Sequence, residues 1–181
     1  MYGKLPPNPN AGTAFNEEDL RTIYLAGGCF WGTQAFMARV PGVASTEVGY
    51  ANGKIKNPTY KDVCGGDTGF VEAVQVKYDP AVAPLEKVLE AFFLTIDPTV
   101  KNRQGNDVGT QYRTGIYYED ERDLPVVEEL VRSEQMRYSR IIVTEVLPLE
   151  NFYLAEEYHQ EYLEKNPGGY CHVDFSKLPQ V

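Results

Sequence analysis

The sequence has few of the features that would direct a protein to a membrane, a secretory pathway or a nucleic acid. Its uninterrupted apolar runs are short, so we expect no transmembrane helix. The N-terminal region lacks a basic start and an apolar core, and so does not resemble a secretory signal. Acidic residues outnumber basic ones, 26 against 17, which gives a formal net charge of −9. This charge repels a nucleic-acid backbone, so we expect no nucleic-acid partner. Because the chain also shows no transmembrane run and no signal, we expect a cytoplasmic enzyme without a membrane partner.

Cysteine and histidine are also scarce. The three cysteines, Cys29, Cys64 and Cys171, are odd in number and widely spaced, so they do not indicate a structural disulfide framework. There is no CxxC pair, and the two histidines are far apart in the chain, which argues against a metal site. Each cysteine therefore has to be judged by its own surroundings.

The length of 181 residues suits one domain with a sizeable core. Residues 1–20 are rich in Pro, Asn and Gly, and we expect them to form an N-terminal arm or flexible tail. Residues 21–181 are predicted to form a single catalytic domain that includes a C-terminal tail over 166–181. A monomer is the expected state.

The apolar pattern predicts an α+β fold whose core is a two-layer, split β-α-β-β-α-β (ferredoxin-like) unit. We expect its strands over residues 22–26, 43–50, 71–78 and 113–118, and its helices over 30–40 and 84–96. An additional C-terminal helix, strand and helix are predicted over 125–136, 141–146 and 150–165. Two long polar stretches, 51–69 and 101–110, are predicted to be loops, and loops of such length in a compact domain usually serve function.

Cys29 lies where a strand, two glycines and a helix follow one another. A sulfur at a helix N-terminus meets free N–H groups and the positive end of the helix dipole, which favour the nucleophilic thiolate. A small buried apolar cysteine is the alternative. The large neighbours Phe30 and Trp31 could form the wall of an apolar substrate pocket or could fill the core.

Glu72 is the second informative residue. It has the same strand parity as Val74, Val76 and Tyr78, which places it on the face expected to be buried. Burial in an apolar setting raises the pKa of a carboxyl group, so Glu72 could remain protonated and act as a general acid. A strand-end residue that turns back to solvent is the alternative.

Longer segments of the chain resemble a known family. The segments GGCFWG, NPTYKDVCGGDTG, VEAVQVKYDP, NRQGNDVGTQYR and AEEYHQEYLEKNPGGYC are similar to those of peptide methionine sulfoxide reductase of the A type. The similarity extends from about Thr22 to Asp174. It implies that the chain reduces the S epimer of methionine sulfoxide, free or in proteins, to methionine.

The resemblance implies catalytic roles for four residues. Cys29 matches the nucleophile that attacks the sulfoxide sulfur, and Glu72 matches the proton donor to the sulfoxide oxygen. Tyr60 and Tyr112 match hydroxyl groups that bind this oxygen. Such donors suit the reaction because charge develops on the oxygen as the S–O bond weakens.

Further positions carry over to substrate binding. Phe30 and Trp31 match the walls that hold the substrate methyl group, and Asp107 matches a polar anchor of the substrate. The chain departs from many relatives at Phe70, where they have histidine. Phe70 cannot donate a hydrogen bond, which puts one supporting contact of the site in doubt.

The resemblance also implies a recycling step. Cys171, in the recycling tail over 166–181, matches the cysteine that resolves a sulfenic acid on Cys29. The resulting disulfide would pass to an external dithiol such as thioredoxin, and no bound cofactor is expected. An inert Cys171, with an external thiol as resolver, is the alternative, and Cys64 is expected to be structural.

Two other functions remain open from the residues alone. A cysteine hydrolase would pair Cys29 with His159 or His172 and an acid such as Asp107. His159, however, is predicted to lie on an apolar helical stripe, where a structural role is expected. A non-catalytic module that docks methionine-bearing peptides is the second possibility, but it leaves the combination of cysteine, glutamate and two tyrosines unexplained.

Overall fold

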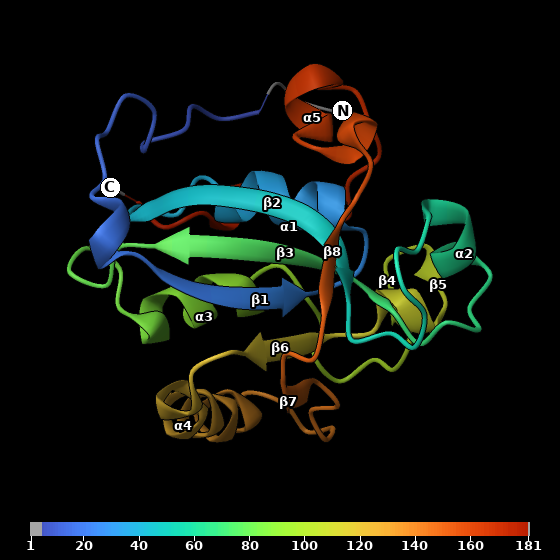
Figure 1. Ribbon diagram of the computed structural model, residues 1–181. Coiled ribbons are helices and arrows are strands. Elements are labelled where there is room, and N and C mark those ends of the chain that lie inside the picture. The colour runs from blue at the N-terminus through green and yellow to red at the C-terminus, as the bar shows by residue number, and fades with distance from the viewer. Residues whose placement is uncertain (1–4, 181) are drawn as a thin grey trace.

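The computed structural model describes residues 5–180, and a six-stranded sheet runs through its centre (Figure 1). Its strand order is β7-β6-β1-β3-β2-β8. The strands are β1 (Arg21–Ala26), β2 (Val43–Ala51), β3 (Val71–Tyr78), β6 (Gly115–Tyr118), β7 (Glu145–Pro148) and β8 (Phe152–Leu154). Only β6 and β7 pair in parallel among these strands, so the sheet is mixed and mostly antiparallel.

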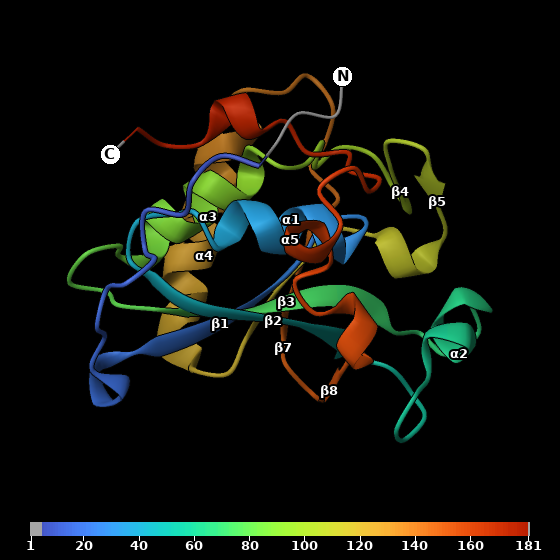
Figure 2. The same cartoon turned by 90° about the horizontal axis from the view of Figure 1, so that it is seen from above.

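The core has an α+β arrangement, as predicted. It consists of β1, α1 (Phe30–Met37), β2, β3, α3 (Leu85–Phe93) and β6. Both helices lie on the same side of the sheet (Figure 2). Pro84, with φ −59°, fits the N-cap of α3, and the apolar stripe of Leu85, Val88, Leu89 and Phe92 is buried.

The two faces of β3 show why Glu72 points toward the helices. Val74 and Val76 pack in the main core beneath α1 and α3, whereas Val71 and Ala73 belong to a smaller apolar cluster on the other face. Side chains alternate along a strand, so Glu72 shares the face of Val74. The predicted parity of β3 is therefore confirmed.

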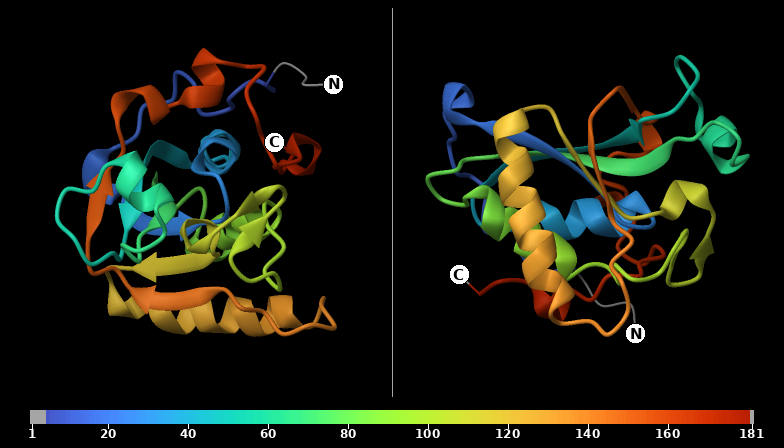
Figure 3. Two further views of the ribbon diagram at one scale, coloured as in Figure 1. Left: turned by 90° about the vertical axis from the view of Figure 1, so that its right-hand side faces the viewer. Right: turned by 90° about the horizontal axis from the view of Figure 1, so that it is seen from below.

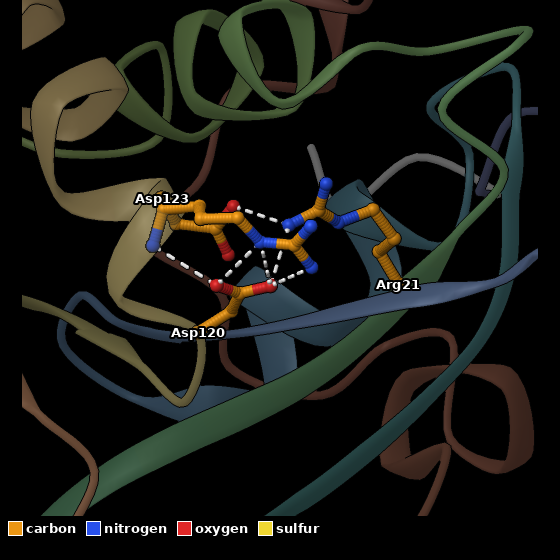
Figure 4. Close-up of polar contacts among 4 residues, drawn as sticks. Arg21, Asp120 and Asp123 are labelled. Carbon is orange, nitrogen blue, oxygen red and sulfur yellow. Dashed lines mark hydrogen bonds and ion pairs between the residues drawn. The ribbon is translucent and has the colours of Figure 1, made fainter.

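α4 (Leu124–Gln135) confirms the predicted third helix and lies along the edge of the sheet near β6 and β7 (Figure 3). Arg21 at the start of β1 fixes the turn before α4, because its guanidinium bonds to Asp120 at 3.2 Å and to Asp123 at 2.8 Å (Figure 4). Within residues 5–180, no helix has the length and apolar character needed to cross a bilayer.

The predicted helix over 150–165 is wrong. Its first part is the strand β8, which pairs with β2, and only the short helix α5 (Tyr162–Lys165) ends the segment. Glu161 has φ 50°, which interrupts any continuous helix. Gly49 permits the pairing, because a Cβ atom there would lie 2.5 Å from both the Phe152 ring and the Tyr153 carbonyl. Tertiary pairing thus overrides the local helical pattern.

Both predicted loops contain regular structure. Residues 51–69 include α2 (Tyr60–Cys64), whose N-cap Thr59 forms a capping box with Asp62. Residues 101–110 include the hairpin of β4 (Arg103–Gln104) and β5 (Asp107–Val108). Each of these short elements presents a predicted site residue, Tyr60 or Asp107, at a defined position.

The N-terminal arm predicted over 1–20 lies partly outside the described residues, which begin at 5. Its described part is tied to the end of α1. The Asn10 side chain donates to the carbonyls of Ala38 and Val40 at 2.9 and 2.8 Å, and Arg39 donates to the Pro6 carbonyl at 2.7 Å. These contacts hold the arm along the helix layer.

Candidate active site

Cys29 is the N-cap residue of α1, as the sequence predicted. The preceding Gly28 has φ +78°, a conformation that glycine adopts without strain. A side chain at this position would also collide with Gln104 at 2.6 Å. This turn places the Cys29 sulfur between the helix layer and the β4–β5 hairpin, where the residue is 8% exposed.

Glu72 lies beside this helix start. It is 2% exposed, and its Oε1 accepts a hydrogen bond from the backbone N–H of Phe30 at 3.2 Å. Burial raises the pKa of Glu72 to about 8, although the Phe30 N–H opposes the shift. At neutral pH the carboxyl group is therefore mostly protonated, which is the state that a general acid requires.

Opposing influences act on the ionisation of the Cys29 sulfur. Burial raises its pKa strongly, and the neighbouring Glu72 raises it further, while the N–H of Trp31 offsets only part of the shift. The loss of water therefore opposes the stabilisation of a thiolate by the helix terminus.

Tyr60 and Tyr112 both lie near this pair. Tyr60 begins α2, and Tyr112 ends the short 3₁₀ turn Thr110–Tyr112. Burial raises the pKa of both phenols, and a charge on Glu72 would raise both further. The two hydroxyl groups therefore remain protonated at neutral pH and are available as hydrogen-bond donors.

Asp107 faces the same site from the hairpin. Its Oδ2 is buried and has no hydrogen-bond partner in the described part of the chain. Burial raises the pKa of Asp107, whereas Tyr170 and His172 oppose the shift. An unsatisfied buried acceptor is costly, and it is expected where a ligand or water completes the site.

An aromatic cluster borders the site on the side of the C-terminal segment. The Trp31 indole stacks on Tyr162, with ring centroids 3.7 Å apart, and its Nε1–H donates to Nδ1 of His159 at 3.0 Å. Phe30 packs against the His159 ring at 5.2 Å and Tyr60 packs against it at 4.6 Å. The indole is therefore held in one orientation by a stack and a hydrogen bond.

Cys171 lies against the first turn of α1. A Cβ atom on Gly32 would approach the Cys171 sulfur to 2.8 Å, so the glycine allows the tail to pack closely there. Gly32 and Cys29 are three residues apart and share one face of the helix. Cys171 is half-buried, and its sulfur accepts from the Val173 N–H at 3.3 Å. All three cysteines are free, and Cys64 is exposed.

The histidine nitrogens do not support a hydrolase. Nδ1 of His159 accepts from Trp31, and the remaining ring nitrogens, Nε2 of His159 and both of His172, have no partner among the described residues. A hydrolase needs its base hydrogen-bonded to the nucleophile or close to that geometry. Within residues 5–180, no group of three or more His, Cys, Asp or Glu side chains is arranged to hold a metal ion.

Phe70, the noted departure, is a core residue. It is 1% exposed and meets the Tyr153 ring edge-on at 5.9 Å. Its ring also fills the space beside Gly53, where a Cβ atom would lie 2.1 Å away. The position supports the loop that carries α2 by packing, with no polar contact to the site.

Two residues near the site were not predicted to contribute to it. His159 was expected on a helical stripe, but it is 1% exposed within the aromatic cluster and bonds to Trp31. Glu156 was not singled out, yet it contacts both Tyr50 and Tyr60. Both lie between β8 and α5. Because this segment was predicted to be one helix, the positions of the two side chains were predicted incorrectly.

Comparison with known proteins gives consistent matches. A family model described as peptide methionine sulfoxide reductase matches residues 21–180. The chain is 56% identical over 154 residues to peptide methionine sulfoxide reductase MsrA of Clostridium acetobutylicum. The aligned residues make up 85% of this chain and 95% of that protein. It is 53% identical to the protein of the same name from Mycoplasma pneumoniae, which covers 86% and 99%.

Solved structures show the same similarity. Reduced Mxr1 from Saccharomyces cerevisiae superposes with a TM-score of 0.82 at 41% identity, covering 90% of this chain and 94% of that one. Mxr1 from the same yeast in complex with Trx2 gives a TM-score of 0.60 at 25% identity, with the same coverage.

Proposed function

Because the chain belongs to the peptide methionine sulfoxide reductase MsrA family of oxidoreductases, we propose that it reduces the S epimer of methionine sulfoxide, free or in proteins, with Cys29 as nucleophile and Glu72 as proton donor. The Glu72 carboxyl supports this proposal most directly. It is buried beside the start of α1 and its pKa is raised to about 8. A neutral carboxyl group next to a thiol suits the removal of oxygen from a sulfoxide, since the oxygen must gain a proton as its bond to sulfur breaks.

The proposed first step transfers one oxygen atom. Cys29 attacks the sulfoxide sulfur, the S–O bond breaks and the oxygen bonds to the Cys29 sulfur, which becomes a sulfenic acid. The substrate sulfur gains two electrons and the cysteine sulfur loses two. Glu72 gives its proton to the oxygen and regains one from the Cys29 thiol, so the protons balance. The hydroxyl groups of Tyr60 and Tyr112 donate to the oxygen as negative charge develops on it.

The walls of the site fit the rest of the substrate. Phe30 and Trp31 are proposed to enclose the methyl group, and the fixed indole of Trp31 supports this role. Asp107, whose Oδ2 lacks a partner among the described residues, is proposed as the polar anchor of the substrate. A methyl pocket on one side and oxygen donors on another would distinguish the two sulfoxide epimers.

Recycling is proposed to use Cys171. Its thiol attacks the sulfenic sulfur of Cys29, a disulfide forms and water leaves. A thioredoxin dithiol then reduces the disulfide by exchange. Packing of Cys171 against Gly32 supports this pairing. The yeast relative that was solved in complex with Trx2 supports an external protein as the reductant.

The proposal also covers the architecture. The strand order β6-β1-β3-β2, with α1 and α3 on one side of the sheet (Figure 2), supports the description of the core as ferredoxin-like. Residues 21–181 would then act as one catalytic domain, with 166–181 as its recycling tail.

Turnover of the separated S and R epimers of methionine sulfoxide with a dithiol reductant tests the function. We expect methionine from the S epimer alone and no turnover by Cys29→Ser. Equal use of both epimers, or an active Cys29→Ser variant, would refute the proposal.

A further inference from the structure

Glu156 connects two tyrosines that come from different parts of the fold. Its Oε1 accepts a hydrogen bond from the Tyr50 hydroxyl at 2.9 Å, and its Oε2 accepts from the backbone N–H of Tyr60 at 3.1 Å. A weaker bond of 3.4 Å comes from the hydroxyl of Tyr158. Both oxygens of this carboxylate are therefore used, and they join β2 to the first residue of α2.

The two ends of this connection differ in how firmly they are held. Tyr50 is fully buried in β2, lies opposite Glu72 in the sheet register and packs on Phe30 at 5.8 Å. α2, in contrast, lies at the end of a long connection away from the main sheet (Figure 1), and Val63 is its one buried residue. Tyr60 is half-buried at the border of the main core, where it bonds to Glu156 and packs on the ring of His159.

The charge of Glu156 is maintained by these bonds. Partial burial alone would raise the pKa of this carboxyl group, but its own backbone N–H, the N–H of Tyr60 and the hydroxyl of Tyr50 together outweigh burial and lower the pKa. The group is thus ionised at neutral pH, and hydrogen bonds to an ionised acceptor are the stronger kind. Its removal would leave the hydroxyl of the buried Tyr50 without its acceptor.

We propose that Glu156 is a positioning residue for Tyr60, which it holds near Glu72 by linking α2 to the buried Tyr50. The inference rests on the proposed function, in which the Tyr60 hydroxyl donates to the sulfoxide oxygen. A donor that acts in the transition state has to be placed before the reaction, and small displacements of such groups are costly. Glu156 acts through Tyr60 and does not itself touch the substrate.

Glu156→Ala, measured by the rate at which the first equivalent of methionine forms, tests the inference. We expect a loss of about 10- to 100-fold in that rate, with little change in the substrate concentration that gives half the maximal rate. Glu156→Gln should restore most of the rate, because its amide oxygen can accept from Tyr60 while its NH₂ group donates to the Tyr50 oxygen.

The same substitution in a Tyr60→Phe background separates positioning from general support of the fold. If Glu156 acts through the Tyr60 hydroxyl, Glu156→Ala costs no further activity once that hydroxyl is absent. An equal further loss in the Tyr60→Phe background would overturn the inference, as would full activity of Glu156→Ala. Far-UV circular dichroism and the unfolding temperature show whether each variant is folded.

Glu157→Ala is the matched control. This neighbouring carboxyl group is 90% exposed and pairs with Lys165 at 3.6 Å, away from both tyrosines. We expect its activity to equal that of the unmodified enzyme, and a loss as large as that of Glu156→Ala would contradict a specific role for Glu156. An unmodified enzyme that does not reduce methionine sulfoxide would instead refute the proposed function, and this inference with it.

Discussion

Burial acts on the carboxyl group of Glu72 and on the thiol of Cys29 in the same direction. Burial raises the pKa of both, and a negative charge on Glu72 would raise the pKa of Cys29 further. In a site with little water, two adjacent anions are strongly disfavoured. The proposed reaction moves the Glu72 proton to the substrate oxygen and returns the Cys29 proton to Glu72.

Glu72→Gln should be slower in the first step by about 10²–10⁴-fold, because the amide cannot donate an acidic proton. The unmodified enzyme should lose first-step activity as pH rises through about 8, where Glu72 deprotonates, and the Gln variant should lack this decline. Single-turnover rates measured between neutral and alkaline pH check both expectations. Glu47→Gln, at an exposed position of β2, is the control.

Glu72→Gln lowers the rate of the first step but should raise the stability of the fold at alkaline pH. The folded-state pKa of Glu72 lies above its unfolded value of 4.5, so its contribution to stability is complete below pH 4.5 and is lost as pH rises through about 8. Glu72→Gln removes this dependence, because the amide never ionises. We therefore expect its free energy of unfolding to exceed that of the unmodified enzyme at alkaline pH, as measured by urea denaturation. An equal or lower value there would contradict a buried, perturbed Glu72.

Single residues were predictable from the sequence where local rules determine their position. Cys29 was placed at a helix start by the preceding glycines, and Glu72 was placed on a buried face by strand parity. The burial of Cys29 was not predictable, because it depends on segments that are distant in the sequence. Glu156 was missed because its partners are distant in the sequence. The structural role expected for His159, in contrast, agrees with its burial and its bond to Trp31.

Among the elements, those with a clear period were predicted well. β3 and α3 have bounds close to those expected, because alternation and the 3.6-residue repeat both follow from burial of one face. The segment before α5 was predicted incorrectly. Phe152, Ala155 and Tyr162 have helical spacing, but the free edge of β2 offers hydrogen bonds that a strand can satisfy, and β8 takes them.

The ion pairs of Figure 4 hold β1 against the start of α4, and their strength can be measured. The side chain of Asp123 is 6% exposed and pairs with Arg21 at 2.8 Å. Arg21→Met should lower the free energy of unfolding by about 1–3 kcal/mol at neutral pH, because it leaves a buried carboxylate unpaired. Urea denaturation checks this value.

The loss of unfolding free energy in Arg21→Met should depend on pH, because the Asp123 carboxyl group can take up a proton. Burial raises the pKa of Asp123 and Arg21 opposes the shift, so the pKa should rise further in Arg21→Met. The loss should then shrink as pH falls through the folded-state pKa, since a protonated carboxyl group needs no cation. Asp123→Asn should likewise reduce the effect of Arg21→Met. A variant as stable as the unmodified protein at neutral pH would show that the pair contributes little.

At the scale of the whole molecule, the site draws on segments far apart in the chain. α1 supplies Cys29 at its start, β3 supplies Glu72, α2 supplies Tyr60 and the tail brings Cys171 to Gly32. The rigid sheet fixes the first two, whereas the last two depend on peripheral segments. This division fits a reaction whose first step uses the core of the site and whose recycling step uses the tail.

One equivalent of methionine-S-sulfoxide, added without reductant, should convert the enzyme to a form crosslinked between Cys29 and Cys171. Mass spectrometry of the digested protein detects this disulfide. Cys171→Ser should still release one equivalent of methionine and accumulate the sulfenic acid on Cys29, whereas Cys64→Ser should behave as the unmodified enzyme. A crosslink between Cys29 and Cys64 instead would show that the exposed cysteine is the resolver.

A measurement of the protonation state of Glu72 at neutral pH tests most directly whether this residue can be the proton donor. Infrared difference spectra between the unmodified enzyme and Glu72→Gln, recorded across a pH series, report the C=O stretch of a protonated carboxyl group. We expect this band at pH 7 and its disappearance with a midpoint at about pH 8. A carboxylate signal at pH 7, with the protonated band present only in acid, would contradict Glu72 as the proton donor.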